Sequence, residues 1–109
     1  MFAHETLYPL DGLAAVQIDG KWGYIDKIGN IAIKPQFDNA AFFSEGLAKV
    51  KMGDKWGYID KTGNLVIKPQ FDNASFFFAG LAGVRIDRKW GYIDQTGNVA
   101  IALQFDSAR

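Results

Sequence analysis

The sequence predicts an all-β fold made of three tandem 34-residue β-meander repeats in a solenoid-like stack. The motif Lys-Trp-Gly-Tyr-Ile-Asp occurs at residues 21–26, 55–60 and 89–94, at a constant spacing of 34 residues. A fixed period of this size is typical of solenoids, propellers and related arrays. Short apolar runs bounded by turn residues, with no sustained 3.6-residue period, favour strands over helices.

A propeller-like arrangement is the alternative architecture. Three blades would make a very small ring, because propellers typically contain about four to eight blades. This alternative therefore requires that another chain complete the ring.

The period divides the chain into three repeats that together form one domain: residues 12–45, 46–79 and a truncated 80–109. Residues 1–11 lie in the phase of a repeat tail, so that Tyr8 matches Phe42 and Phe76. Either the chain is a fragment of a longer array, or this segment completes the last repeat, by closing a ring or by pairing with a neighbouring chain. Terminal repeats normally need a polar cap, so an open end predicts self-association.

Composition supports a folded core and argues against several classes of protein. Apolar residues make up 49% of the chain and aromatic residues 15%, and the 12 basic side chains equal the 12 acidic ones. Without a basic excess we expect no nucleic-acid partner. No apolar stretch approaches the roughly 20 residues of a membrane helix, so we expect no membrane partner. The first residues resemble no signal peptide, which slightly favours the cytoplasm without fixing the compartment.

The first hairpin of each repeat is marked by two strands and a two-residue turn. Residues 13–18 form the first expected strand and residues 21–26 the second. Asp19-Gly20 between them suits a primed hairpin turn, which needs positive φ at both positions. Gly53-Asp54 suits such a turn as well, whereas Asp87-Arg88 is poorer because Arg88 does not easily adopt positive φ.

The second half of each repeat continues the meander. Residues 26–29 predict a type I turn with Asp at its first position and Gly at its fourth. The third strand follows at residues 30–33 and ends at Lys34-Pro35, because Pro has no N–H to donate. Residues 38–45 then form a Phe-rich connector, in which we expect at most one helical turn.

Alternation along these strands predicts one core face and one outer face. The second turn places Ile31 against Ile25 and Ile33 against Gly23. The residues expected on the core face are Ala14, Val16, Ile18, Ile25, Ile31 and Ile33. Gly23 leaves a hole in that face, which a connector ring such as Phe37 or Phe42 would fill.

The outer face is expected to carry aromatic and cationic side chains together. In repeat 1 it holds Trp22, Tyr24, Gln17 and Lys34. In later repeats Trp56 opposes Lys51 and Trp90 opposes Arg85, and both pairs suit cation–π contact.

The recurring positions carry a family likeness. The pattern G-L-A-x-V…K-W-G-Y-I-D-x-x-G-x-x-x-I…F-D-x-A resembles the bacterial WG repeat, also called the KWG repeat, over nearly the whole chain from Gly12 onward. The resemblance implies tandem β-rich repeats with a binding or scaffolding role. It implies no single reaction and brings no catalytic residues.

The aromatic side chains give the most specific hypothesis about a site. Stacked repeats would align six of them into a ladder able to hold sugar rings, choline-like cations or prolines: Trp22, Tyr24, Trp56, Tyr58, Trp90 and Tyr92. Lys51 and Arg85 beside the ladder favour a ligand. The competing interpretation is that these rings pack against the next repeat as a second core layer. Phe78 is the best candidate for contact with a partner, because three consecutive rings at 76–78 cannot all point inward.

Acidic residues and histidine give no catalytic or metal site. Asp26 and its copies Asp60 and Asp94 open type I turns, and Asp38 and its copies are expected to cap the connector. His4 has no Ser or Cys partner in sight. We therefore expect no metal, no cofactor and no enzymatic activity.

These observations predict a non-catalytic repeat module for protein–protein interaction or scaffolding. The alternative function is binding of a carbohydrate or cell-envelope ligand through the Trp/Tyr ladder. A protein partner is expected in the first case.

Overall fold

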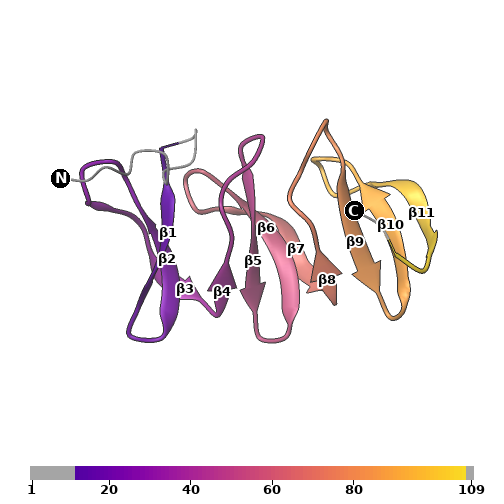
Figure 1. The fold of residues 1–109 in the computed structure, drawn as a ribbon, viewed down its shortest axis with the longest axis horizontal. Helices are drawn as coiled ribbons and strands as arrows, with labels where there is room; N and C mark the ends of the chain where they lie inside the picture. Colours follow the sequence, from indigo (N-terminus) through magenta and orange to yellow (C-terminus); the bar gives the residue numbers. More distant parts are fainter. Residues whose placement is uncertain (1–11, 108–109) are drawn as a thin grey trace.

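The computed structural model describes residues 12–107, which form three antiparallel sheets stacked one after another along the long axis (Figure 1). Strands and turns account for these residues, and no helix in them could cross a membrane. The strands in chain order are β1 (Ala14–Ile18), β2 (Lys21–Ile25), β3 (Ile31–Phe37), β4 (Asn39–Ala40), β5 (Leu47–Met52), β6 (Lys55–Asp60), β7 (Leu65–Phe71), β8 (Asn73–Ala74), β9 (Ala82–Ile86), β10 (Lys89–Ile93) and β11 (Val99–Phe105).

The last strand of each of the first two repeats, β4 or β8, belongs to the sheet of the following repeat. Sheet 1 has the order β1-β2-β3, sheet 2 the order β4-β5-β6-β7, and sheet 3 the order β8-β9-β10-β11. The connector holds the short strand β4 and no helical turn, and β4 pairs Asn39 with Lys51 and Ala40 with Val50. A backbone pairing across the repeat boundary therefore joins consecutive repeats.

The expected hairpin and turns are confirmed. Val16 lies opposite Gly23 in the β1–β2 pair, as the two-residue turn requires. Asp19 and Gly20 have φ values of 52° and 84°. At the corresponding turn of repeat 3, Asp87 takes the positive φ of 59° and Arg88 does not, which avoids the steric cost we anticipated at Arg88.

The pairing of β2 with β3 differs from our expectation. Ile33 lies opposite Tyr24 instead of Gly23, and Phe37 lies opposite Trp22. Residues 34–36 therefore bulge across Gly23, and β3 continues past Pro35 to Phe37. The strand does not end at this proline, because Pro35 lies in the bulge, where its nitrogen need not donate a ladder hydrogen bond.

Backbone atoms fill the slot at this glycine, so our assignment of a Phe37 or Phe42 ring to it was wrong. A Cβ on Gly23 would lie 2.5 Å from the Ile33 carbonyl oxygen and 2.7 Å from the Pro35 nitrogen. Gly57 and Gly91 have the same close neighbours in their own repeats. No side chain fits at this position, which explains why glycine follows each tryptophan.

Both faces of the middle sheet are buried, so the expectation of a single core face was wrong. The core between sheets 1 and 2 takes six residues from repeat 1, namely Leu13, Tyr24, Ile33, Phe37, Ala40 and Phe43, and three from repeat 2, namely Ala48, Val50 and Ile59. The core between sheets 2 and 3 consists of the same positions 34 residues later. The outer face of one sheet thus packs on the inner face of the next.

The stack is open. β1 and β11 lie at opposite ends of the row (Figure 1), and the three described sheets do not close into a ring. Residues 12–107 therefore show the expected solenoid-like stack.

The close approach at Gly57 generates a stability prediction. We expect Gly57→Ala to lower the free energy of unfolding by roughly 1–3 kcal/mol or more, because the added Cβ overlaps the backbone of residues 67–69. Urea denaturation followed by circular dichroism measures the loss. The matched control is Gly53→Asp, since Asp19 and Asp87 occupy the same turn position with positive φ. Equal stability of Gly57→Ala and the wild type would contradict the bulge geometry.

Candidate interaction surface

The six aromatic residues of the proposed ladder do not form an exposed stripe. Tyr24 and Tyr58 are completely buried, each in a core between sheets. Trp22 and Trp56 are half-buried against the same two cores. Tyr92 and Trp90 are half-buried as well. For Tyr24 and Tyr58 the core interpretation is therefore the right one, and the ladder interpretation was wrong.

The buried tyrosines hold the connectors in place. The Tyr24 hydroxyl donates to the Ala41 carbonyl oxygen at 2.6 Å, and its ring meets Phe43 edge-on with centroids 4.9 Å apart. Tyr58 makes the same hydrogen bond to Ser75, also at 2.6 Å. Burial raises the pKa of both phenols well above its ordinary value. These rings and hydroxyls are occupied within the fold and are not available to a ligand.

The cation–π contact involves a lysine that sequence reasoning did not select. Lys51 and Arg85 lie opposite Trp56 and Trp90 in the expected register. The cation over the Trp56 ring is instead Lys49, whose Nζ lies 4.7 Å from the ring centroid.

Lys49 also links two sheets. Its Nζ donates to the Ala74 carbonyl oxygen of β8 at 2.8 Å, and burial lowers the pKa of this amine. Ala15 and Gly83 occupy the same phase in repeats 1 and 3. This break in the period was the sequence signal that could have identified Lys49.

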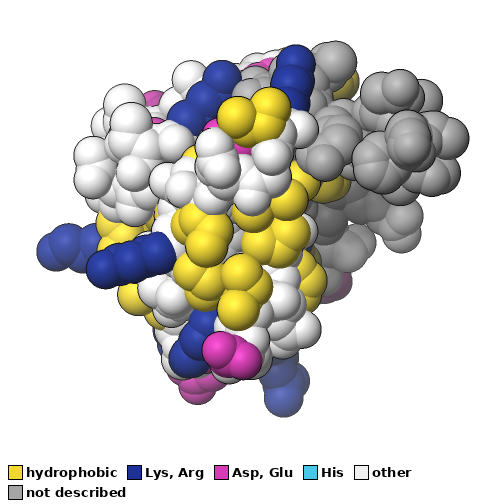
Figure 2. Space-filling model, turned by 90° about the vertical axis from the view of Figure 1, so that its left-hand side faces the viewer, with side chains coloured by type: hydrophobic (Ala, Val, Ile, Leu, Met, Phe, Trp, Pro, Cys, Tyr) yellow, Lys and Arg dark blue, Asp and Glu magenta, His cyan; other side chains and the backbone are white. Residues whose placement is uncertain are grey.

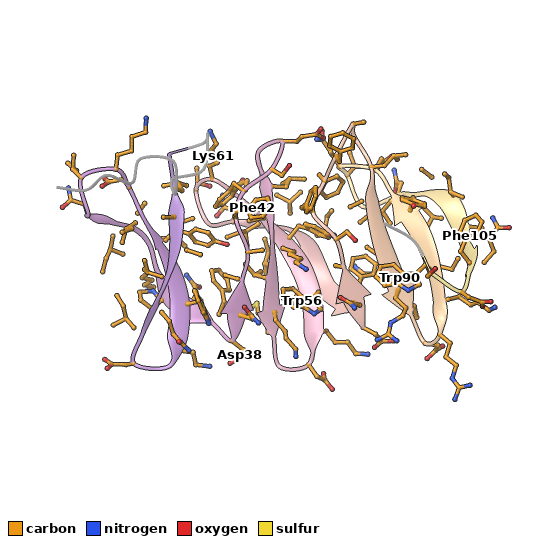
Figure 3. The ribbon with its side chains drawn as sticks, viewed as in Figure 1. Asp38, Phe42, Trp56, Lys61, Trp90 and Phe105 are labelled. Atoms are coloured by element: carbon orange, nitrogen blue, oxygen red, sulfur yellow. The ribbon has the colours of Figure 1, made fainter. Side chains whose placement is uncertain are left out.

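Exposed aromatic rings lie along a different part of the stack, at the connectors. Phe42 and Phe76 are each about half exposed, and their ring centroids are 5.5 Å apart. Phe78 is 74% exposed, whereas Phe77, which lies between Phe76 and Phe78 in the sequence, is fully buried. We call Phe42, Phe76 and Phe78 the aromatic row; Figure 3 shows Phe42 in the upper half of the view and Asp38 near the lower edge. The exposure of Phe78 agrees with its selection as a contact residue.

Hydrogen bonds fix the two connectors relative to each other. The Ser44 hydroxyl donates to the Phe77 carbonyl oxygen at 2.7 Å. The Glu45 carboxylate accepts from the Ala79 and Gly80 amides, at 2.6 and 2.8 Å, and from the Gln95 side chain at 3.2 Å. The aromatic row is therefore presented by an ordered backbone.

A second turn type in the connector was missed by sequence reasoning. Glu45 and Ala79 have φ values of 56° and 54°, each followed by a glycine that also has positive φ. Each pair sits between residues that form an isolated bridge, Ser44 with Leu47 and Phe78 with Leu81. The signal that could have found these turns is the residue-glycine pair before each Leu-Ala, which is typical of a primed turn.

The recurring aspartates have structural partners. Asp26 Oδ1 accepts from the Ile28 and Asn30 amides at 3.1 and 2.9 Å, which confirms its role in the turn. Among residues 12–107, no three acidic, histidine or cysteine side chains are placed to hold a metal ion. His4 lies outside the described residues.

Asp38 and Asp72 do not cap their own connectors, so that expectation was wrong. Asp38 Oδ2 accepts from the Gly53 amide of the next hairpin at 2.7 Å, and Oδ1 accepts from Lys21 Nζ at 2.6 Å. Asp72 repeats both contacts, with the Asp87 amide at 2.6 Å and with Lys55. The lysine hydrogen bond is the main cause that lowers the pKa of each carboxyl. Each aspartate thus connects the lysine of one repeat motif to the turn of the next repeat.

Comparison with known families gives one finding. A family model described as a WG containing repeat matches residues 8–22, 22–56, 56–90 and 90–109. Each internal match runs from one tryptophan of the period to the next. No curated protein and no solved structure matches the chain. The similarity is therefore to a repeat family and brings no activity with it.

The buried tyrosines generate a stability prediction. Tyr58→Phe keeps the ring but leaves the Ser75 carbonyl without its donor, so we expect a loss of about 1 kcal/mol in unfolding free energy. Tyr58→Ala removes the ring from the core as well and should cost roughly 3–5 kcal/mol. Chemical denaturation measures both variants. A cost of Tyr58→Ala no larger than that of a surface substitution would contradict this packing.

Alkaline pH tests the same burial. The folded protein holds the phenolic protons of Tyr24 and Tyr58 more tightly than the unfolded chain does, because burial raises both pKa values. Stability from this source is complete below the unfolded pKa of about 10 and is lost as pH rises above it. We expect phenolate absorbance from these two residues to appear only with loss of the β circular dichroism signal. Phenolate formation by all tyrosines in an intact fold would contradict it.

Proposed function

Because the chain belongs to the WG-containing repeat family, we propose that it acts as a non-catalytic repeat module that binds a protein partner through the aromatic row. The observation that supports this proposal is the exposure of Phe42, Phe76 and Phe78 on connectors that are hydrogen-bonded to each other. Phe rings at such a place are not needed for the core, since Phe43 and Phe77 already supply it.

The chemistry of the aromatic row favours a protein over a sugar. Aromatic residues are enriched at the centre of protein interfaces, where they desolvate against apolar pockets of the partner. Three phenylalanines offer no hydroxyl or indole N–H of their own to a sugar. The connector backbone is already ordered, so little conformational entropy would be lost on binding.

The carbohydrate or cell-envelope alternative loses part of its basis. It requires a row of accessible Trp and Tyr rings, and Tyr24 and Tyr58 are completely buried. The half-buried Trp22, Trp56 and Trp90 pack on the cores or lie beside cationic residues. The carbohydrate alternative therefore becomes an outcome of the test below.

The proposal of a non-catalytic role is supported by how the polar side chains of residues 12–107 are used. Asp26, Asp60 and Asp94 bind backbone amides of their own turns. Asp38 and Asp72 bind lysines and the amides of the next hairpin. The hydrogen bonds of these aspartates are thus structural in the described part of the chain, which supports a non-catalytic role.

Capture of partners from a lysate of the source cell tests the proposal. The wild-type chain is immobilised, and retained proteins are identified by mass spectrometry and then measured singly. We expect Phe78→Ser, which copies Ser44 of repeat 1, to weaken a specific partner at least about tenfold, which corresponds to about 1.4 kcal/mol. A Phe42→Ser/Phe76→Ser variant should weaken it further.

A matched control removes exposed apolar surface elsewhere. Ile28 is 81% exposed in a turn where the later repeats have Thr62 and Thr96. Ile28→Thr should bind the partner as the wild type does. If a partner binds the wild type and both Phe variants equally well, the aromatic row is not its site. Specific retention on a glycan array that survives the Phe substitutions would instead favour the carbohydrate alternative.

A further inference from the structure

The two cores between sheets are copies of one interface. Each takes six residues from the outer face and connector of one repeat and three from the inner face of the next. Large rings on one side, such as Tyr24 and Phe37, meet small or branched side chains on the other, such as Ala48 and Val50. Any pair of sheets that presents these two faces can form the same interface, because the fit lies in side chains that recur every 34 residues.

One face of this kind is less buried at sheet 1 than at sheets 2 and 3. Ala14, Val16 and Ile25 occupy the positions of the inner-face residues, and we call them the N-terminal end face. Their copies in sheets 2 and 3 are at most 1% exposed, whereas these three are only half-buried. Figure 2 looks onto this end of the molecule and shows hydrophobic side chains gathered at its middle.

The complementary face is partly exposed at sheet 3. Ile101 and Phe105 occupy two of the outer-face positions, and we call them the C-terminal end face. Ile101 is 38% exposed where Ile67 is 4% exposed, and Phe105 is 39% exposed where Phe71 is 3% exposed. Figure 3 shows Phe105 at the far end of the stack from sheet 1.

We propose that a second copy of this chain stacks head to tail on the first, with the C-terminal end face of one copy packed on the N-terminal end face of the other. The junction would reproduce the two interfaces already inside the chain. A symmetric pairing of like faces fits less well, since it would set rings against rings or Ala14 and Val16 against themselves.

Polar groups at the two ends match the same register. Asp38 and Asp72 each accept a backbone amide from the next hairpin turn, at Gly53 and Asp87. At the end of the stack, Asp106 has a side chain that is 93% exposed, against 40% for Asp38 and 25% for Asp72. Asp19, whose φ of 52° is close to the 59° of Asp87, offers the corresponding amide in a second copy.

A head-to-tail contact buries only one end face of each copy, so the other end face of each copy stays available for a further copy. Every added copy leaves one face of each kind at the ends, so growth is linear and rises with concentration. This association is independent of the proposed partner binding, because the aromatic row lies on the connectors and the end faces lie on sheets 1 and 3.

The test is sedimentation velocity and light scattering on the 109-residue chain, from dilute solution to its solubility limit. We expect the mean mass to rise with concentration without stopping at a dimer. Val16→Glu blocks the N-terminal end face and Ile101→Glu blocks the C-terminal end face, and each variant alone should remain a monomer.

Mixing the two variants gives the decisive result. Val16→Glu retains an intact C-terminal end face and Ile101→Glu an intact N-terminal end face, so the mixture should form a heterodimer that grows no further. Circular dichroism confirms that each variant is folded, and Ala14→Arg replaces Val16→Glu if the latter unfolds.

Phe78→Ser is the matched control. It should associate as the wild type does while losing the protein partner. Val16→Glu and Ile101→Glu should each bind the protein partner but fail to self-associate. A wild-type monomer at every concentration would overturn the proposal. A dimer that never grows, or a mixture of the two variants that stays monomeric, would also overturn it.

Discussion

The close approach of the third strand to the motif glycine is the constraint on which the remaining structure depends. At Gly57 the backbone of residues 67–69 occupies the space where a side chain would begin. The bulge lets β7 run on until Phe71 lies opposite Trp56, with Ile67 already opposite Tyr58. Both apolar side chains therefore point to the face that receives the next sheet. Without the bulge, Phe71 would not lie opposite Trp56, and Asp72 would not lie where the chain passes from sheet 2 to sheet 3.

The crossing from one sheet to the next follows directly from this geometry. A single aspartate separates β3 from β4 and again β7 from β8. Its carboxylate binds the lysine of its own motif and an amide of the next hairpin, so one side chain sets the spacing of two sheets. The tyrosine of the motif then holds the connector through its hydroxyl. The recurring Lys, Gly and Tyr therefore have structural roles.

Much of the architecture could be predicted from the sequence, and most of the errors concern contacts between repeats. Local rules correctly placed the Asp19-Gly20 hairpin, the Asp26 turn and the pairing of Val16 with Gly23. They failed at the bulge between β2 and β3 within a repeat, and where a contact joins two repeats. Assigning one core face treated a repeat as a free-standing sheet, and assigning the cation–π contact to Lys51 considered only one hairpin, whereas Lys49 also reaches Ala74 in the next sheet. The connector was misjudged because the partner strand of Asn39–Ala40 belongs to the following repeat.

The sequence by itself determined the period, the strand class, the register of the first hairpin and the turns at Asp19 and Asp26, because these depend on residues that are close in the chain. Only the tertiary structure decided which apolar faces are covered, since burial depends on what packs against a face and not on the face alone. Tyr58 and Tyr92 stand in identical motifs, yet one is completely buried and the other half-buried. The same difference separates Phe77, which fills a core, from Phe78, which faces solvent one residue later. Stacking of whole sheets, and not local pattern, therefore decided which aromatic residues are buried in the cores and which remain exposed.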